Sequence, residues 1–164
     1  MTTPETPASV PAQARIDTRD RETLDGRRVG HEHRLRVRVY YEDTDFTGLV
    51  YHASYVRFFE RGRTEFLRSV GLEHAKLLAR ADPCAFAVTR LDVRFQRSAR
   101  IDDVLEVATA WREMKGARML ISQRIERHGE AIAMAEVEVV CITDKGTARR
   151  LPADLAATLR PLLE

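Results

Sequence analysis

A single stretch of helical period precedes a long region of strand patterns, and this arrangement constrains the fold more than any other feature. In residues 53–70, apolar side chains recur along one stripe, as in an amphipathic helix. Residues 85–143 instead form apolar-rich segments of strand character, separated by short turns. One long helix has one apolar stripe to bury, so we expect an α+β domain in which a sheet packs on that helix.

Periodicity and turn residues set the bounds of the expected elements. Residues 34–42 alternate between two faces, which predicts a half-buried strand with Leu35, Val37, Val39 and Tyr41 on one side. In chain order, the expected elements are a strand at 34–42, a loop at 43–51, helices at 53–70 and 73–80, strands at 85–96, 104–114, 118–127 and 131–143, and a C-terminal helix at 152–163.

The first 33 residues differ in composition from the rest. Residues 1–15 contain three prolines and almost no bulky apolar side chain, and residues 16–33 are highly charged without periodicity. Neither part has enough apolar surface to offset the conformational entropy that folding removes. We therefore expect a disordered tail at 1–33 and one folded domain at 34–164, a normal length for a single domain.

Composition and charge limit the class of protein. Apolar residues make up 44% of the chain and charged residues 32%, which is typical of a globular protein in water. No apolar run approaches the ~20 residues of a transmembrane helix, and no signal-peptide pattern is present, so we expect a cytoplasmic location. The net charge of +2 does not indicate a nucleic acid partner. Cys84 and Cys141 lie far apart in apolar surroundings, which favours two small buried side chains over a disulfide framework.

Three polar side chains that could do chemistry gather just before the long helix: Asp43, Asp45 and His52. A helix N-terminus has unpaired N–H groups and a partial positive charge, so it can hold an anion or a developing oxyanion. Thioester hydrolysis needs such an oxyanion site and a group that attacks the carbonyl or activates water. An aspartate can take either role, and this chemistry requires no metal and no redox cofactor.

The same residues also have plain structural explanations. An aspartate before a helix usually caps the helix or shapes a turn, and Tyr41 can simply pack in the core. Gly48 permits a tight turn or the close approach of a ligand. Gly62, inside the predicted helix, permits the close approach of a strand or a partner helix. The residues alone therefore leave a catalytic and a structural role for Asp45 both open.

The run from Val39 to Tyr55, which reads VYYEDTDFTGLVYHASY, resembles the Tol-Pal-associated acyl-CoA thioesterases. These are hotdog proteins of the 4-hydroxybenzoyl-CoA thioesterase type. The similarity continues in four further segments. They are 59–68, 90–95, 99–103 and 149–152. The resemblance implies a hotdog fold, in which a curved antiparallel sheet wraps a long central helix. It also implies homodimers joined edge to edge, often paired into tetramers, with active sites at the dimer interface.

Residue by residue, the resemblance assigns roles around the start of the helix. Asp45 matches the catalytic aspartate of the family. His52 matches the second polar residue of the motif, whose backbone N–H would polarise the thioester carbonyl. Tyr41 matches a tyrosine proposed to assist, and Gly48 and Val50 match positions that shape the loop.

This chain departs from the family directly after the catalytic position. Small residues are common there, whereas this chain has Phe46 and Thr47, and a bulkier pair could reshape the acyl pocket. The CoA phosphates would need cations, and Arg94, Arg97 and Arg100 cluster near a strand end as possible donors.

The sequence therefore predicts an acyl-CoA thioesterase that releases a free acid and CoA, with Asp45 as nucleophile or general base. Two alternatives remain. Hotdog folds also host hydratases and dehydratases. The chain could also be a non-catalytic acyl-CoA-binding or scaffolding module, loosely attached to a membrane or envelope complex.

Overall fold

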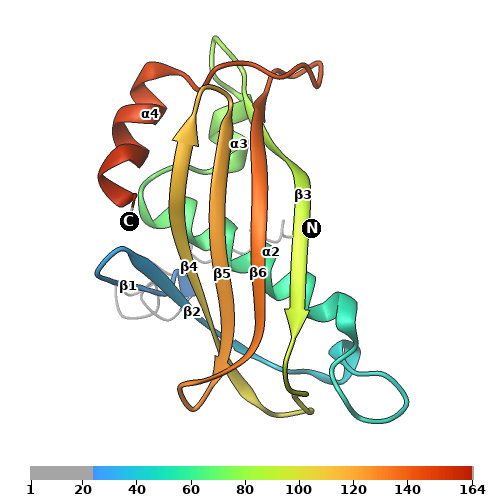
Figure 1. Cartoon of the computed structure of the whole chain (residues 1–164). Coiled ribbons are helices and arrows are strands. Elements are labelled where there is room, and N and C mark those ends of the chain that lie inside the picture. The colour runs from blue at the N-terminus through green and yellow to red at the C-terminus, as the bar shows by residue number, and fades with distance from the viewer. Residues whose placement is uncertain (1–23, 164) are drawn as a thin grey trace, which may run out of the picture.

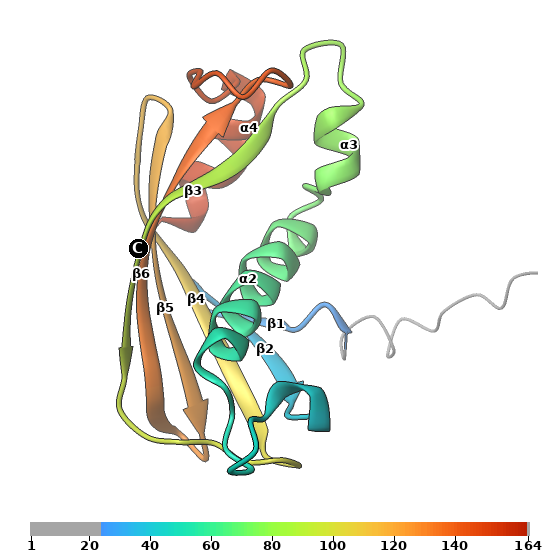
Figure 2. The ribbon, with the colours of Figure 1, turned by 90° about the vertical axis from the view of Figure 1, so that its right-hand side faces the viewer.

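A curved sheet wraps one long helix in this computed structural model, which describes residues 24–163. Within these residues the sheet has six strands in the order β1-β2-β4-β5-β6-β3, and every neighbouring pair is antiparallel. Figure 1 looks onto the sheet with the helix α2 behind it, and Figure 2 shows the sheet curving around α2. The strands are β1 (Arg27–Val29), β2 (Glu32–Arg38), β3 (Ala85–Phe95), β4 (Val104–Lys115), β5 (Arg118–Arg127) and β6 (Glu130–Ile142). The helices are α2 (His52–Ser69), α3 (His74–Leu78) and α4 (Ala153–Leu159), with 3-10 turns η1 (Tyr41–Asp43) and η2 (Arg160–Leu162).

The core lies between α2 and the inner face of the sheet. Phe58, Phe59 and Phe66 project from α2 and are completely buried, and α2 packs against β2, β4 and β5. Burying each of these rings contributes roughly 2–3 kcal/mol. Because a one-residue slip would turn the apolar side of a strand to solvent, this burial also fixes the strand register. The α+β architecture expected from the helical stripe is confirmed.

Gly62 lets α2 lie close to the sheet. A Cβ atom at this position would stand 2.7 Å from Val107 Cγ1 and 2.9 Å from Thr109 Oγ1. Both neighbours are β-branched residues with stiff side chains. The close approach expected at Gly62 is therefore the approach of a strand, β4, of the same chain.

We expect Gly62→Ala to destabilise the fold by up to about 2 kcal/mol. The substitution gains roughly 1 kcal/mol in helix propensity, whereas overpacking of a tight core costs typically 1–3 kcal/mol. Urea unfolding followed by circular dichroism measures the difference. A variant stabilised by about 1 kcal/mol, as helix propensity alone predicts, would show that the contact with β4 yields easily.

Two expectations at the start of the domain were wrong. The predicted tail includes residues 27–33, but these form β1 and the beginning of β2, with Arg27 opposite Arg34. Residues 1–23 of that tail lie outside the described residues. The first predicted strand ends at Arg38 rather than at 42, so Tyr41 falls in η1 and is 84% exposed instead of packed in the core.

The other elements agree with their predicted bounds within a few residues. The predicted C-terminal helix is divided, because α4 ends at Leu159 and continues as η2, where Pro161 cannot donate a helical hydrogen bond. Cys84 and Cys141 are both buried, as expected. Among residues 24–163, no helix is long and apolar enough to cross a membrane.

Candidate active site

The loop between η1 and α2 is closed at its base by Asp43, whose side chain is almost completely buried. Its Oδ2 accepts a hydrogen bond from the Tyr40 N–H at 2.9 Å. Its backbone oxygen accepts from the Tyr51 N–H at 2.9 Å and from Ser54 Oγ at 3.0 Å. Arg57 donates to Ser54 Oγ at 2.8 Å and lies 3.7 Å from Asp43 Oδ1. Asp43 therefore joins both ends of the loop to the first turn of α2.

Replacing Asp43 with alanine should destabilise the protein by about 2 kcal/mol, because a hydrogen bond to a charged group is worth ~1.5–3 kcal/mol and the Tyr40 N–H loses its acceptor. Thermal or urea unfolding measures the loss. Asp144→Ala is the matched control, since Asp144 is exposed in the turn after β6. Equal stability of the two variants would show that Asp43 does not anchor the loop.

Beyond this anchor, the chain makes a narrow hairpin that carries Asp45. Thr44 and Val50 form an antiparallel bridge, and the Asp45 N–H donates to the Leu49 oxygen at 2.9 Å. The turn closes with the Gly48 N–H donating to the Asp45 oxygen at 3.0 Å, and Gly48 has a φ of 76°, a conformation that favours glycine. The hairpin returns the chain from Asp45 directly to the start of α2, and Figure 1 shows it projecting beside that helix end.

Thr47 holds the Asp45 carboxylate by one oxygen. Asp45 Oδ1 accepts from Thr47 Oγ1 at 2.5 Å and from the Thr47 N–H at 2.8 Å. The hydroxyl first, and then the N–H, hold the pKa of Asp45 below its ordinary value, so this exposed carboxyl is ionised at neutral pH. Both of these hydrogen bonds end at Oδ1, so Oδ2 is the oxygen that can meet a ligand.

The N-terminus of α2 lies at the same end of the loop. Tyr51 is the N-cap residue and makes no side-chain cap, and the first turn contains no acidic residue. The N–H groups of His52 and Ala53 therefore have no acceptor within the helix. Nothing in the first turn neutralises the positive end of the helix dipole. An ionised carboxylate and a helix end that can bind an oxyanion thus belong to the same loop.

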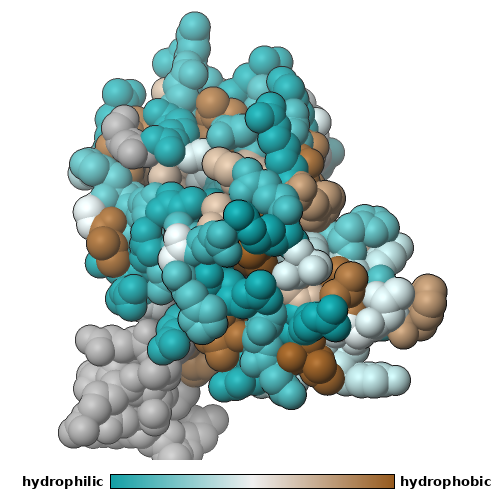
Figure 3. Space-filling view, turned by 60° about the horizontal axis from the view of Figure 1, so that its bottom comes forward, coloured by the Kyte–Doolittle hydropathy of each residue, from teal (hydrophilic) through white to brown (hydrophobic). Residues whose placement is uncertain are grey.

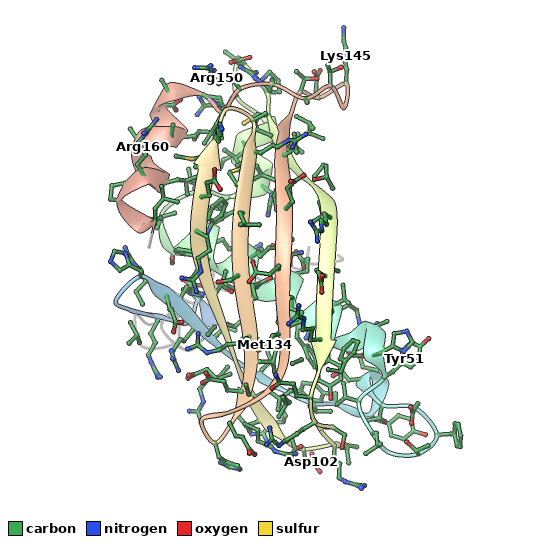
Figure 4. All side chains as sticks on the ribbon, in the orientation of Figure 1. Tyr51, Asp102, Met134, Lys145, Arg150 and Arg160 are labelled. Atoms are coloured by element: carbon green, nitrogen blue, oxygen red, sulfur yellow. The ribbon has the colours of Figure 1, made fainter. Side chains whose placement is uncertain are left out.

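A third segment supports the loop from the side of the sheet. The Val50 N–H donates to the Ala99 oxygen at 2.9 Å, and Leu49 forms an antiparallel bridge with Arg100. The Ala99 N–H in turn donates to Tyr55 Oη at 2.9 Å. In Figure 4, Tyr51 and Asp102 mark the two segments at this end of the molecule. The loop is therefore fixed both to α2 and to the segment that follows β3.

The structure brings together most of the predicted site residues. Asp45, Gly48 and Val50 lie in the hairpin, with Val50 buried beneath it, and His52 is the first residue of α2. The exposed His52 ring contacts the Tyr51 ring, with 4.2 Å between centroids. Tyr41 lies before the hairpin and is solvent-exposed.

The three arginines expected near a strand end do not form one cluster. Arg94 lies on the outer face of β3, opposite Met134 of β6. Arg97 pairs with Glu130 at 2.9 Å and donates to the Ala131 oxygen at 3.1 Å. Only Arg100 adjoins the hairpin. Strand alternation thus turns Arg94 to the outer face, and the Glu130 carboxylate holds Arg97 away from Arg100.

Two residues that shape this site, Asp43 and Thr47, could not be recognised as such from the sequence. The position of Asp43 before the helix does not by itself reveal its role, because its hydrogen bonds to Tyr40, Tyr51 and Ser54 form only when the chain folds back between η1 and α2. Thr47 was noted only for its bulk, whereas the structure gives it two hydrogen bonds to Asp45. A signal was present, because an aspartate commonly accepts a hydrogen bond from the residue two positions later in a turn.

Exposed aromatic side chains surround the hairpin. Phe46 at its tip is 100% exposed, and Tyr40, Tyr41 and Tyr51 are all exposed as well. Figure 3 views the molecule from this end, and pale to brown surface gathers on the lobe that projects to the right. So much uncovered apolar surface is typical of a site that receives a ligand or a second protein chain.

Comparison with known proteins identifies the family to which this chain belongs. The model of the thioesterase-like superfamily matches residues 39–159. The acyl-CoA thioester hydrolase YbgC of Escherichia coli O6:H1 is 43% identical over 129 residues, which cover 77% of this chain and 95% of the relative. The acyl-CoA thioesterase YbgC of Haemophilus influenzae is 45% identical over 106 residues, covering 65% of this chain and 77% of the relative.

A solved structure agrees with these relatives. The crystal structure of a probable thioesterase from Bartonella henselae superposes with a TM-score of 0.72 at 40% identity, covering 74% of this chain and 99% of that one. The chain therefore belongs to the thioesterase-like superfamily. The family resemblance, the hotdog fold and the enzyme class predicted from the sequence are confirmed.

Proposed function

We propose that this protein hydrolyses the thioester bond of an acyl-CoA, with Asp45 as the reacting carboxylate and the N-terminus of α2 as the oxyanion site. The observation that carries the proposal is the ionised Asp45 carboxylate, held at Oδ1 by Thr47, on the hairpin that leads directly into a helix start without a side-chain cap. The YbgC relatives, which are called acyl-CoA thioesterases, support the substrate class.

Two routes are open to the carboxylate, and both end in the same products. As a nucleophile, Asp45 Oδ2 attacks the carbonyl carbon, CoA leaves as a thiolate, and water then hydrolyses the mixed anhydride. As a general base, Asp45 takes a proton from a water molecule that attacks the same carbon. In either route the N–H groups of His52 and Ala53 stabilise the negative charge on the carbonyl oxygen. The released CoA thiolate then takes up a proton, so that the products are the free acid and CoA in its thiol form.

The proposal includes a homodimer formed by pairing β3 of two copies. β3 is an edge strand of 11 residues without a proline, and its free backbone groups can bind another strand. Its side chains on the inner face extend beyond α2, so that Val88 is 48% exposed, Leu91 36% and Phe95 50%. Apolar residues on an unpaired edge favour association with an identical edge, because a two-fold axis makes the surface complementary to itself.

Such a dimer would complete the site. Antiparallel pairing about a two-fold axis sets the end of one β3 beside the start of the other. The Asp45 hairpin adjoins the segment after β3, where Leu49 bridges Arg100. Each hairpin would therefore lie next to the partner subunit, which could bind part of the CoA. Four further expectations from the sequence stay predictions. They are the tetramer, the contact with a membrane or envelope complex, the cytoplasmic location, and the binding of phosphate by Arg94, Arg97 and Arg100.

The function is tested by incubating the protein with acyl-CoAs of different chain length and aromatic character while free thiol is followed with a thiol reagent. We expect thiol release with at least one of them. Binding without thiol release would favour the acyl-CoA-binding module, and addition of water across an enoyl-CoA double bond, seen as loss of its ultraviolet absorbance, would favour the hydratase. Absence of thiol release with every acyl-CoA would contradict the proposal.

A further inference from the structure

We propose that Thr47 is a positioning residue for the reaction of Asp45: it holds Oδ1 and thereby directs Oδ2 to the substrate. This inference rests on the proposed function and extends it to a second residue of the hairpin. Its basis is the pair of hydrogen bonds to Asp45 Oδ1, one from Thr47 Oγ1 at 2.5 Å and one from the Thr47 N–H at 2.8 Å.

The two hydrogen bonds from Thr47 come from different groups and have different effects. The bond from the backbone N–H is the ordinary turn in which an aspartate accepts from the residue two positions later, and any residue except proline can supply it. The bond from the hydroxyl requires threonine or serine. It is short and charge-assisted, the stronger kind of hydrogen bond. A substitution of the Thr47 side chain that keeps the backbone N–H therefore changes the orientation of the carboxylate without changing the shape of the turn.

The surroundings of the carboxylate leave Thr47 as its main support. Asp45 lies on an exposed hairpin, so no packing fixes its side-chain rotamer, and no side chain other than Thr47 binds its oxygens among residues 24–163. The Leu49 N–H lies 3.4 Å from Thr47 Oγ1 on the acceptor side of the hydroxyl, which favours the orientation that donates to Asp45. A carboxylate held by one oxygen presents the other in a fixed direction. A displacement of the reacting oxygen by ~1 Å can lower the rate about a hundredfold.

The hydroxyl also acts on the charge of Asp45. A donor to the ionised form lowers the pKa of the carboxyl, and the Thr47 hydroxyl is the main cause of the low pKa of Asp45. Other titratable or charged groups on the elements around the hairpin are Tyr41, Glu42 and Asp43 of η1, Tyr51, His52 and Arg57 at the start of α2, and Arg100, Asp102 and Asp103 after β3. All of these stay the same when only Thr47 is replaced, so a change in the acid limb of activity reports on the Thr47 hydroxyl.

Thr47→Val is the decisive variant, because valine keeps the branched shape and the backbone N–H and removes only the hydroxyl. We expect kcat to fall about tenfold with KM nearly unchanged, and the acid limb of kcat/KM to move to higher pH, because the carboxylate loses the hydroxyl that lowers the pKa of Asp45. Thr47→Ser restores the hydroxyl and should restore both quantities. Circular dichroism and the unfolding midpoint establish that the three proteins are equally folded.

A Thr47→Val protein that keeps the kcat and the acid limb of the wild type would overturn the positioning role while leaving the thioesterase function in place. A fall in kcat that serine does not reverse would also overturn it, because the loss would then come from the shape of the turn. Failure of the thioesterase function is a different result: the wild type itself would release no thiol from any acyl-CoA.

Discussion

Asp45→Asn should lower kcat by about 10³-fold or more, which corresponds to roughly 4 kcal/mol of lost transition-state stabilisation. Asparagine has almost the same shape as aspartate and can still accept hydrogen bonds from Thr47, so the hairpin should keep its conformation. An amide is neutral, and it neither attacks a thioester nor takes a proton from water at neutral pH. The measurement is steady-state thiol release from the best acyl-CoA of the panel.

Asp102→Asn is the matched control for this substitution. Asp102 is an exposed aspartate at the same end of the molecule, with a φ of 68°, and asparagine tolerates that conformation as well as aspartate does. We expect wild-type turnover in the control and wild-type binding of CoA in both variants. Turnover within a few-fold of the wild type in Asp45→Asn would refute the assignment of Asp45.

Heavy-oxygen water distinguishes the two possible roles of the carboxylate. Under single-turnover conditions, a nucleophilic Asp45 gains the label in its own side chain if water attacks the acyl-enzyme at the aspartyl carbonyl, and mass spectrometry of the peptide detects it. A general base never exchanges its oxygens, so the label then appears only in the product acid. A low pKa weakens the Asp45 carboxylate as a base and as a nucleophile alike, so both routes stay open until the label is located, and label in the Asp45 peptide identifies the nucleophilic one.

Most elements of the fold could be predicted from local periodicity. The apolar stripe of α2 and the alternation in β4, β5 and β6 depend on residues close together in sequence, and these elements have nearly the predicted bounds. β1 was missed because Arg27–Val29 has no apolar face of its own. It is held from a distance, by pairing with β2 and by an ion pair between Arg27 and Glu106 at 3.0 Å.

The site was predictable in its centre and not at its edges. The motif from Asp45 to His52 lies on one short loop, so its residues had to be neighbours in space. The end of the first strand could not be predicted from the alternation, which continues beyond it. The Asp43 side chain accepts a hydrogen bond from the Tyr40 N–H, and the chain turns there instead of continuing as a strand. Arg97 could not be placed either, since its partner Glu130 is distant in sequence.

The second large effect is expected from Leu91→Lys on the free edge of the sheet. Leu91 stands opposite Val137 and so faces the inner side of β3, where it remains 36% exposed in the single chain. In the proposed dimer this side chain is covered by the partner, and two copies lie close to the two-fold axis. Two lysines there would bring like charges together and leave them poorly solvated. We expect the dimer to dissociate into folded monomers and thiol release to fall about a hundredfold, because each Asp45 hairpin loses the partner that completes its site.

Leu120→Lys is the control that makes this test specific. Leu120 is 37% exposed, almost the same as Leu91, but it lies on β5 in the middle of the sheet, where its strand is paired on both sides. Sedimentation velocity and light scattering should give a monomer for Leu91→Lys and retain the β3-paired dimer for Leu120→Lys, with normal circular dichroism in both. A Leu91→Lys protein that stays dimeric would place the interface elsewhere. A folded monomer with full activity would show that one chain holds a complete site, because the Asp45 hairpin and the α2 N-terminus would then be sufficient without a partner.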